Sequence, residues 1–346
     1  MLNRFPTGAL TAIITPFTNE GRIDSEALNR LVDFQIHQGI SGIVSAGTTG
    51  ETSAMTPSEH CSILSGAMAW MKRTPIFFGC GSNSTDEAME YVEIVARNGG
   101  KYVLLVDPYY NGPSSLEIRR EYLAPIAKRF PNVSIISYVV PARTGCALLP
   151  EDLAALENEF PGRFAVKEAT GDLERMALTR KLTHTDFPIY CGDDGKTFDT
   201  MARPDILSCG IISVVSNIAP RAVQEMCQAI LAGGPQTAET IRTKLQPLFD
   251  IVTVSAPRTA FGTRVVVDKF RNPLPIKTAM SILGMPAGPC RQPLGKMTIA
   301  GATKVRAALE TVWERNPEVL LPVQNFFGVN IGERLEDDEI LASLTY

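Results

Sequence analysis

The sequence has few of the side chains that build metal centres. Of its 346 residues only three are histidine, and its seven cysteines stand singly, with no C-x-x-C pair and no H-E-x-x-H motif. Zinc sites use clusters of such ligands at short spacings, so we expect no metal. Isolated cysteines in a large chain are typical of buried, reduced thiols and not of a disulfide framework.

An excess of one charge and long apolar runs are also lacking. The chain carries 33 lysine and arginine residues against 37 aspartate and glutamate residues, which argues against a nucleic-acid partner. No stretch approaches the roughly 18 consecutive apolar residues of a membrane span. The first residues, Met1–Pro6, lead directly into a strand-like segment and leave no room for a secretory leader. We therefore predict a cytoplasmic, enzyme-sized globular protein with no membrane partner.

The first 230 residues alternate between short apolar runs and longer helical patterns. The apolar runs predict strands buried on both faces, as in a parallel sheet. We predict an α/β fold, a (β/α)₈ TIM barrel, with its active site at the carboxyl ends of the strands. A doubly wound open sheet is the alternative, although no G-x-G-x-x-G motif opens a helix. The expected strands are Leu10–Ile14, Gly42–Ala46, Ile76–Gly79, Tyr102–Val106, Val133–Tyr138, Phe164–Lys167, Pro188–Cys191 and Gly210–Val214.

The alternation stops near Pro235. Helical patterns cover Thr237–Thr253, Lys277–Leu283 and Thr303–Glu314, with no clear strand between them. We therefore predict a catalytic barrel over residues 1–233, an all-helical C-terminal domain over residues 234–315 and a C-terminal extension over residues 316–346. The sequence leaves open whether the extension packs on the body or forms a mobile tail.

Polar side chains at the expected carboxyl ends of the strands are candidates for chemistry. Lys167 closes a strand whose side chains point into an apolar barrel, where burial disfavours the ammonium form. A neutral amine there can attack a keto carbon and form a Schiff base. Tyr138 ends the preceding strand, from which its phenol would relay protons. The alternatives are a lysine paired with a carboxylate and a tyrosine bonded to the backbone.

Two nearby loops carry groups suited to carboxylates. Thr48 and Thr49 lie in a glycine-flanked turn whose hydroxyl and backbone N–H groups can hold such an anion. Arg143, just beyond the strand that ends at Tyr138, can clamp a second carboxylate with two hydrogen bonds. An ordinary Gly/Thr turn and a solvated loop arginine are the alternatives.

Four motifs occur along the chain in the order Gly47–Glu51, Asp107–Asn111, Tyr138–Gly145 and Phe164–Glu168, with supporting matches at Cys191–Asp194 and from Gly210 to Asn217. Together they resemble the dihydrodipicolinate synthase / N-acetylneuraminate lyase family of pyruvate-dependent class I aldolases, over about residues 7 to 312. The resemblance implies a TIM barrel with a C-terminal helical domain, assembled as a homotetramer or homodimer. It implies no cofactor other than a covalent pyruvate imine.

The resemblance also implies a role for each candidate. Lys167 would form the imine with pyruvate, and Tyr138 would assist imine formation and proton transfer. Thr48 and Thr49 would hold the pyruvate carboxylate, and Thr49 would also pass protons along a hydroxyl relay. Tyr110 would complete that relay from the neighbouring subunit. The substrate-binding set is Thr48, Thr49, Arg143, Gly192 and Ile212.

Within the family, Arg143 and the Thr48–Thr49 pair favour the synthase branch. Such an enzyme condenses pyruvate with aspartate β-semialdehyde to 4-hydroxy-tetrahydrodipicolinate, on the route to diaminopimelate and lysine. The alternatives are a 2-keto-3-deoxy sugar-acid aldolase or dehydratase, an N-acetylneuraminate lyase-like enzyme, and a non-catalytic barrel that acts as a binding protein. Val139 departs from the family, which usually has asparagine there. A candidate allosteric lysine site comprises Thr52, Ser53, His60, Asn83, Glu87 and Tyr109.

Overall fold

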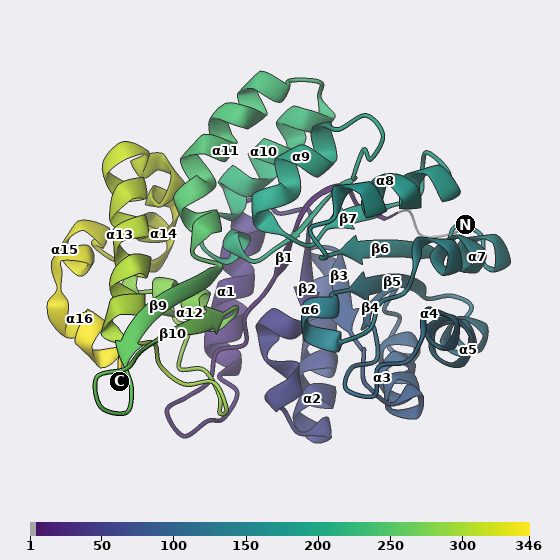
Figure 1. The fold of residues 1–346 in the computed structure, drawn as a ribbon, viewed down its shortest axis with the longest axis horizontal. Helices are drawn as coiled ribbons and strands as arrows, with labels where there is room; N and C mark the ends of the chain where they lie inside the picture. Colours follow the sequence, from purple (N-terminus) through teal and green to yellow (C-terminus); the bar gives the residue numbers. More distant parts are fainter. Residues whose placement is uncertain (1–4) are drawn as a thin grey trace.

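The computed structural model describes residues 5–346 and contains a closed barrel of eight parallel strands (Figure 1). Strands pair in sequence order, and β8 closes the barrel onto β1, where Gly8 lies opposite Gly210. The TIM-barrel prediction is therefore confirmed. The strands are β1 (Gly8–Ala12), β2 (Gly42–Ser45), β3 (Ile76–Gly79), β4 (Tyr102–Val106), β5 (Ser134–Val139), β6 (Phe164–Glu168), β7 (Ile189–Cys191) and β8 (Gly210–Ser213).

Helices surround the outside of the barrel. Thr56 starts α2 with a capping box, in which its hydroxyl accepts from the Glu59 N–H while the Glu59 carboxylate accepts from the Thr56 N–H. The helices are α1 (Ser25–His37), α2 (Pro57–Ala67), α3 (Thr85–Arg97), α4 (Ser115–Glu117), α5 (Ala124–Arg129), α6 (Pro141–Thr144), α7 (Pro150–Glu159), α8 (Leu173–Leu182), α9 (Thr197–Ala202) and α10 (Pro220–Leu231). Short turns of other helix types are η1 (Thr48–Gly50), η2 (Thr52–Ala54), η3 (Met68–Lys72), η4 (Ile118–Leu123), η5 (Asp194–Lys196) and η6 (Val215–Asn217).

Side chains alternate along the strands between two apolar cores. Tyr138 belongs to the core inside the barrel, whereas Val139 belongs to the core between the strands and the outer helices. Successive strand residues point to opposite faces, which explains this separation. The departure from the family at Val139 therefore fills the outer core and does not face the barrel interior.

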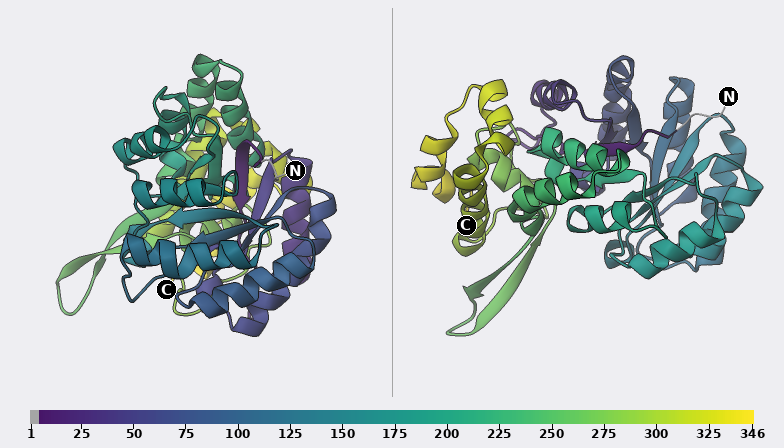
Figure 2. Two further views of the ribbon diagram at one scale, coloured as in Figure 1. Left: turned by 90° about the vertical axis from the view of Figure 1, so that its right-hand side faces the viewer. Right: turned by 90° about the horizontal axis from the view of Figure 1, so that it is seen from above.

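The C-terminal region is largely helical, but the expectation that it has no strands was wrong. Strands β9 (Thr253–Thr259) and β10 (Val265–Arg271) form an antiparallel hairpin that extends away from the body (Figure 2). Val254 and Ala256 are buried while their neighbours along β9 are exposed, a period of two that a helix does not produce. The helices of this region are α11 (Pro235–Asp250), α12 (Leu274–Ile282) and α13 (Ile299–Arg315).

The C-terminal extension packs on the body. Phe327 lies against the ring of Phe34 on α1, with 5.2 Å between ring centroids, and Ile331 and Leu335 are buried. These contacts decide the question that the sequence left open, because a segment with buried apolar anchors is not a mobile tail. The extension contains η7 (Pro317–Val319), α14 (Leu321–Phe327), α15 (Ile331–Glu336) and α16 (Asp338–Ser343).

Candidate active site

Lys167 and Tyr138 lie side by side at the carboxyl ends of β6 and β5. The two residues are register partners, both side chains are buried, and Lys167 Nζ lies 4.1 Å from the centroid of the Tyr138 ring. Within residues 5–346 no carboxylate forms an ion pair with Lys167. The adjacent Glu168 points to the outer core and pairs with Arg175, with 2.9 Å between Glu168 Oε2 and Arg175 Nε. The paired-lysine alternative is therefore wrong, and the amine faces the barrel interior.

The Thr48–Thr49 turn closes the end of β2. It forms the short helix η1, and Glu51 follows with a φ of 61°, in the left-handed region. Gly79 on the neighbouring strand lets this loop approach, because a Cβ there would lie 1.9 Å from the Ala46 carbonyl oxygen. Thr49 is buried, and Thr48 lines a cavity at the barrel mouth.

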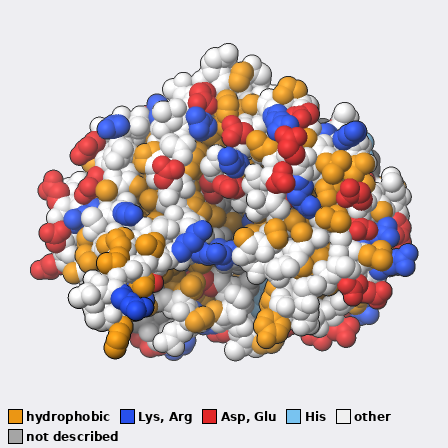
Figure 3. All heavy atoms as spheres, in the orientation of Figure 1, with side chains coloured by type: hydrophobic (Ala, Val, Ile, Leu, Met, Phe, Trp, Pro, Cys, Tyr) orange, Lys and Arg blue, Asp and Glu red, His pale blue; other side chains and the backbone are white. Residues whose placement is uncertain are grey.

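This cavity, of about 330 Å³, joins the barrel mouth to the loops after β2, β3 and β5. Arg143 lines it together with Thr48, as expected for groups that bind substrate. On the face in Figure 3, a hollow lies near the centre with basic side chains beside it. Lys167 and Tyr138 do not line the cavity; Tyr138 belongs to the core inside the barrel, and Val140 belongs both to that core and to the cavity wall. Val140 therefore connects the core that contains Tyr138 with the cavity.

Gly192 and Ile212 lie at the ends of the two strands that follow Lys167. The Gly192 N–H donates to the Glu168 carbonyl oxygen at 2.8 Å, and a Cβ at Gly192 would lie 2.7 Å from the Ala169 Cβ. Glycine is thus needed for the close approach of this loop to β6. Ile212 is buried in the same interior core as Tyr138. Both predicted residues therefore lie at the same end of the barrel as Lys167.

Tyr110 is not part of the site within one chain. Its side chain is 91% exposed, and its φ of 81° turns the backbone into a conformation that non-glycine residues rarely adopt. The preceding Tyr109 instead lines the cavity, half-buried.

The candidate lysine-site residues occupy the outer part of the same cavity. His60 Nε2 donates to the Gly79 carbonyl oxygen at 2.7 Å, and burial lowers the pKa of its imidazole. Tyr91, which the sequence did not single out, donates to Glu87 Oε1 at 2.8 Å. Asn83 is exposed and does not line the cavity, so it is not brought together with the others. The residues that do line it are Thr52, Ser53, His60, Glu87 and Tyr109.

Two residues that contact the site's loops, Asn272 and Lys277, were missed by the sequence reasoning. Asn272, directly after β10, donates from Nδ2 to Thr49 Oγ1 at 2.9 Å, and its backbone oxygen accepts from Arg143 Nη2 at 2.9 Å. Lys277 on α12 forms a buried ion pair with Glu51, with 2.8 Å between Nζ and Oε1. No local motif signals these contacts, because the partners are more than 120 residues apart.

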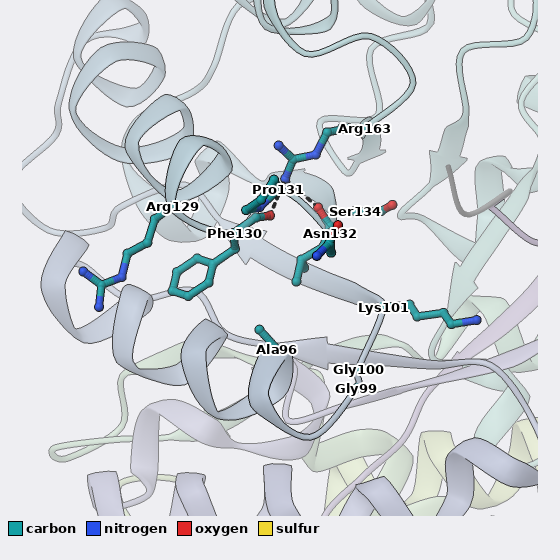
Figure 4. A pocket seen from close by; sticks show the side chains of 11 residues that line it. Ala96, Gly99, Gly100, Lys101, Arg129, Phe130, Pro131, Asn132, Ser134 and Arg163 are labelled. Carbon is teal, nitrogen blue, oxygen red and sulfur yellow. Dashed lines mark hydrogen bonds between the residues drawn. The ribbon is translucent and has the colours of Figure 1, made fainter. Parts of the chain in front are cut away.

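A second hollow, of about 740 Å³, lies at the opposite end of the barrel and contains none of the candidates (Figure 4). Its wall includes Arg163, which donates to the carbonyl oxygens of Ala127 at 2.7 Å, Phe130 at 2.6 Å and Val133 at 2.7 Å. These bonds tie the loop before β5 to the start of β6. In TIM barrels this end supports stability and the other end carries chemistry.

The described part of the chain offers no site for a metal. No group of three or more His, Cys, Asp or Glu side chains within residues 5–346 is arranged to hold one. The same residues include no helix that is both long and apolar enough to cross a membrane.

Comparison with known proteins agrees with this arrangement. The model of the dihydrodipicolinate synthetase family matches residues 5–312. The 4-hydroxy-tetrahydrodipicolinate synthase of Laribacter hongkongensis is 38% identical over 306 residues, which cover 88% of this chain and 98% of that protein. The synthase of Nitratidesulfovibrio vulgaris (strain DP4) is 35% identical over 304 residues, covering 88% and 97%.

Solved structures give the same result. The 4-hydroxy-tetrahydrodipicolinate synthase of Methylacidiphilum fumariolicum SolV superposes with a TM-score of 0.80 at 32% identity, covering 92% of this chain and 99% of that one. The lysine-bound enzyme of Cyanidioschyzon merolae superposes with a TM-score of 0.79 at 31% identity, covering 88% and 98%. With the family model matching most of its length and relatives above 30% identity, this chain belongs to the dihydrodipicolinate synthetase family.

Proposed function

We propose that this chain is a 4-hydroxy-tetrahydrodipicolinate synthase, which condenses pyruvate with aspartate β-semialdehyde. The observation that carries the proposal is the buried, carboxylate-free Lys167 beside the phenol of Tyr138, 4.1 Å from Nζ to the ring centroid. At the same end of the barrel lie two kinds of carboxylate-binding group, the threonine hydroxyls after β2 and the Arg143 guanidinium after β5. A reaction that joins two carboxylate substrates through a Schiff base requires these parts.

The chemistry begins at Lys167. Its amine attacks the keto carbon of pyruvate, the oxygen leaves as water, and a C=N bond joins the lysine to the substrate. Tyr138 supplies the proton that makes that oxygen a leaving group. The pyruvate methyl group then loses a proton, and the electron pair of its C–H bond forms an enamine. Lys167 is thus both the attachment point and the electron sink.

The enamine carbon attacks the aldehyde carbon of the second substrate, and the aldehyde oxygen takes up a proton to become the 4-hydroxyl group. The amino group of the semialdehyde then attacks the imine carbon. The C–N bond to Lys167 breaks, the ring closes, and the free amine is restored. The balance of the cycle is one pyruvate and one semialdehyde consumed, with one cyclic product and one water released.

The two carboxylates are assigned to opposite walls. Thr48 and Thr49 hold the pyruvate carboxylate through hydroxyl and backbone N–H groups, close to the Lys167 strand end. Arg143, which lines the cavity, binds the carboxylate of the semialdehyde. Gly192 and Ile212 shape the floor between them. With the two carboxylates held by different groups, the reacting carbons of the two substrates can meet at Lys167.

We assign a role to the exposed Tyr110 in a homodimer or homotetramer. Its side chain is 91% exposed and its backbone is strained, which supports a role outside its own chain. That role is to complete the proton relay of a neighbouring subunit's site through Thr49. The barrel of residues 1–233 would be the catalytic domain, residues 234–315 a C-terminal domain and residues 316–346 an extension. The seven unpaired cysteines support a cytoplasmic location.

Lysine is a candidate regulator at the outer part of the cavity. Glu87 offers a carboxylate to an ammonium group there, and His60 is fixed below by its bond to the Gly79 carbonyl. A related synthase has been solved with lysine bound. Inhibition of turnover by lysine, and its loss in Glu87→Ala, would support this role, whereas turnover that is insensitive to lysine would remove it.

Borohydride trapping tests the proposed function. Incubation with pyruvate and borohydride should add a pyruvate-derived group to Lys167, which peptide mass spectrometry locates, and Lys167→Ala should show no adduct. Arg143→Ala should still be trapped but should lose roughly 100-fold in kcat/KM for the semialdehyde. An adduct without semialdehyde turnover would point to a sugar-derived acceptor. The absence of an adduct would overturn the Schiff-base mechanism.

A further inference from the structure

Arg143 and Arg271 reach across the same gap at the mouth of the barrel. Arg143 Nη2 donates to the carbonyl oxygen of Asn272 at 2.9 Å, and Arg271 Nη1 donates to the carbonyl oxygen of Ala142 at 3.2 Å. Each side chain thus extends from its own loop to the residue beside the other arginine. The two guanidinium groups therefore lie close together, and both residues are exposed.

No carboxylate neutralises this pair of arginines. Neither guanidinium forms an ion pair with any residue that the structure describes. The segments that carry them contain no acidic residue, from 139 to 150 and from 269 to 309. Asp268, the only acidic residue of the hairpin, pairs with Arg258, and both carboxylate oxygens of Glu51 are bound by other groups. The pair is therefore a concentration of positive charge without a counter-ion in the chain.

The two charges affect each other. Because Arg143 lies in a cavity, the surrounding protein lowers the pKa of its guanidinium, and the charge of Arg271 acts in the same direction. Like charges held close together disfavour each other, and an anion bound between them removes that penalty. Each guanidinium uses one N–H for its carbonyl contact and keeps the others for a ligand. The pair is thus suited to a carboxylate, which accepts several hydrogen bonds at once.

The acceptor aldehyde brings a carboxylate to this place. Arg143 lines the cavity, and the proposed function assigns the carboxylate of the acceptor to it. We propose that Arg271 binds the same carboxylate together with Arg143, and thereby selects acceptor aldehydes that carry one. This inference rests on the proposed function. It makes the base of the β9–β10 hairpin part of the acceptor site.

The strand β10 supplies a matched control for this role. Exposed and partly buried residues alternate along it, so Lys269 and Arg271 lie on the same exposed face. Arg271 ends the strand and touches the loop that carries Arg143, whereas Lys269 lies two residues further out along the hairpin. A charge at Lys269 acts on the acceptor only through solvent, where salt screens it.

Two aldehydes that differ in the carboxylate isolate the role of Arg271. With pyruvate saturating, we would measure kcat and KM for aspartate β-semialdehyde and the inhibition constants of succinate semialdehyde and butanal, in which a methyl group replaces the carboxylate. Arg271→Gln removes the charge but keeps an N–H donor for the Ala142 carbonyl. It should raise the KM and the inhibition constant of succinate semialdehyde by roughly 10- to 100-fold, the range for a hydrogen bond to a charged group. It should change kcat and the inhibition constant of butanal by less than about twofold.

Two further variants separate contact from general attraction and from loop positioning. Arg271→Lys keeps the charge and should raise the KM less than Arg271→Gln, and it carries the test if the glutamine variant does not fold. Lys269→Gln should change the KM by less than about twofold. Equal effects of Lys269→Gln and Arg271→Gln would indicate long-range attraction, and a lower kcat with weaker butanal binding would indicate that Arg271 only holds the loop. Either result would overturn the inference.

The proposed function can fail separately from this inference. A wild-type enzyme that traps pyruvate on Lys167 but does not turn over aspartate β-semialdehyde would overturn the proposed function and this inference with it. Turnover of aspartate β-semialdehyde with an unchanged KM in Arg271→Gln would overturn this inference alone.

Discussion

Replacing Lys277 should destabilise the protein more than replacing an exposed lysine. Lys277 Nζ donates to the Thr15 carbonyl at 3.0 Å, to Glu51 Oε1 at 2.8 Å and to the Pro289 carbonyl at 2.7 Å. The side chains of Lys277 and Glu51 are 2% and 1% exposed. Lys277→Met would leave the Glu51 charge buried without its cation, a change that costs about 3–5 kcal/mol in comparable cases.

A double-mutant cycle separates this effect from simple loss of packing. Adding Glu51→Gln to Lys277→Met removes the buried charge, so the double variant should be more stable than Lys277→Met alone by about 1–2 kcal/mol. Lys244→Met is the matched control, because the Lys244–Glu318 pair is exposed and should contribute under about 1 kcal/mol. Urea unfolding at one fixed protein concentration measures the wild type, the two single variants Lys277→Met and Glu51→Gln, the double variant and the Lys244→Met control. A loss of under about 1 kcal/mol in Lys277→Met, or no recovery in the double variant, would refute the reasoning.

Three further predictions concern other parts of the chain. Burial raises the pKa of Asp107 to about 7, so its proton binds more tightly in the folded state and stability falls as pH rises from about 4 to about 7, by at most about 4 kcal/mol. Asp107→Asn should flatten that dependence in thermal unfolding, and an unchanged slope would contradict the assignment. Arg163→Ala should cost about 3 kcal/mol in unfolding, since three hydrogen bonds are lost, while pyruvate kinetics stay unchanged. Tyr110→Phe should lower kcat about tenfold or more at unaltered stability, and an unchanged kcat would remove its relay role.

The barrel was predictable because its strands are continuous apolar runs between polar helices. The predicted and observed ends of a strand differ where buried residues continue past the last residue that pairs with the neighbouring strands. The first strand was expected at Leu10–Ile14 but spans Gly8–Ala12, although Ile13 and Ile14 are fully buried. An apolar run marks the buried part of the chain, whereas pairing is decided by the neighbouring strands.

The hairpin was missed for a related reason. Its β10 strand carries Val265 and Val267 on an exposed face, so polar and apolar residues do not separate cleanly between its two sides. The helical pattern before it was extended to Thr253, beyond the observed end of α11 at Asp250. A two-stranded ribbon that buries little area gives a weak period-two signal.

Some residues of the site could also be predicted from local sequence patterns, and others could not. Lys167, Tyr138 and the threonine pair lie at strand ends, where the barrel topology alone predicts that they converge. Asn272 carries no such signal, because an asparagine before a proline between a hairpin and a helix is common loop chemistry. Its partner Thr49 is 223 residues away, and only the folded chain brings them together.

The same turn after β2 is held twice by the C-terminal region. Asn272 bonds to Thr49, and Lys277 pairs with Glu51 two residues further on. Neither contact is made by a barrel strand or by a helix of the barrel. Because the turn carries the hydroxyls assigned to pyruvate, its geometry depends on residues beyond the barrel. The region that the sequence presents as a helical appendage is therefore a structural part of the active site, and the barrel alone does not fix the position of Thr49.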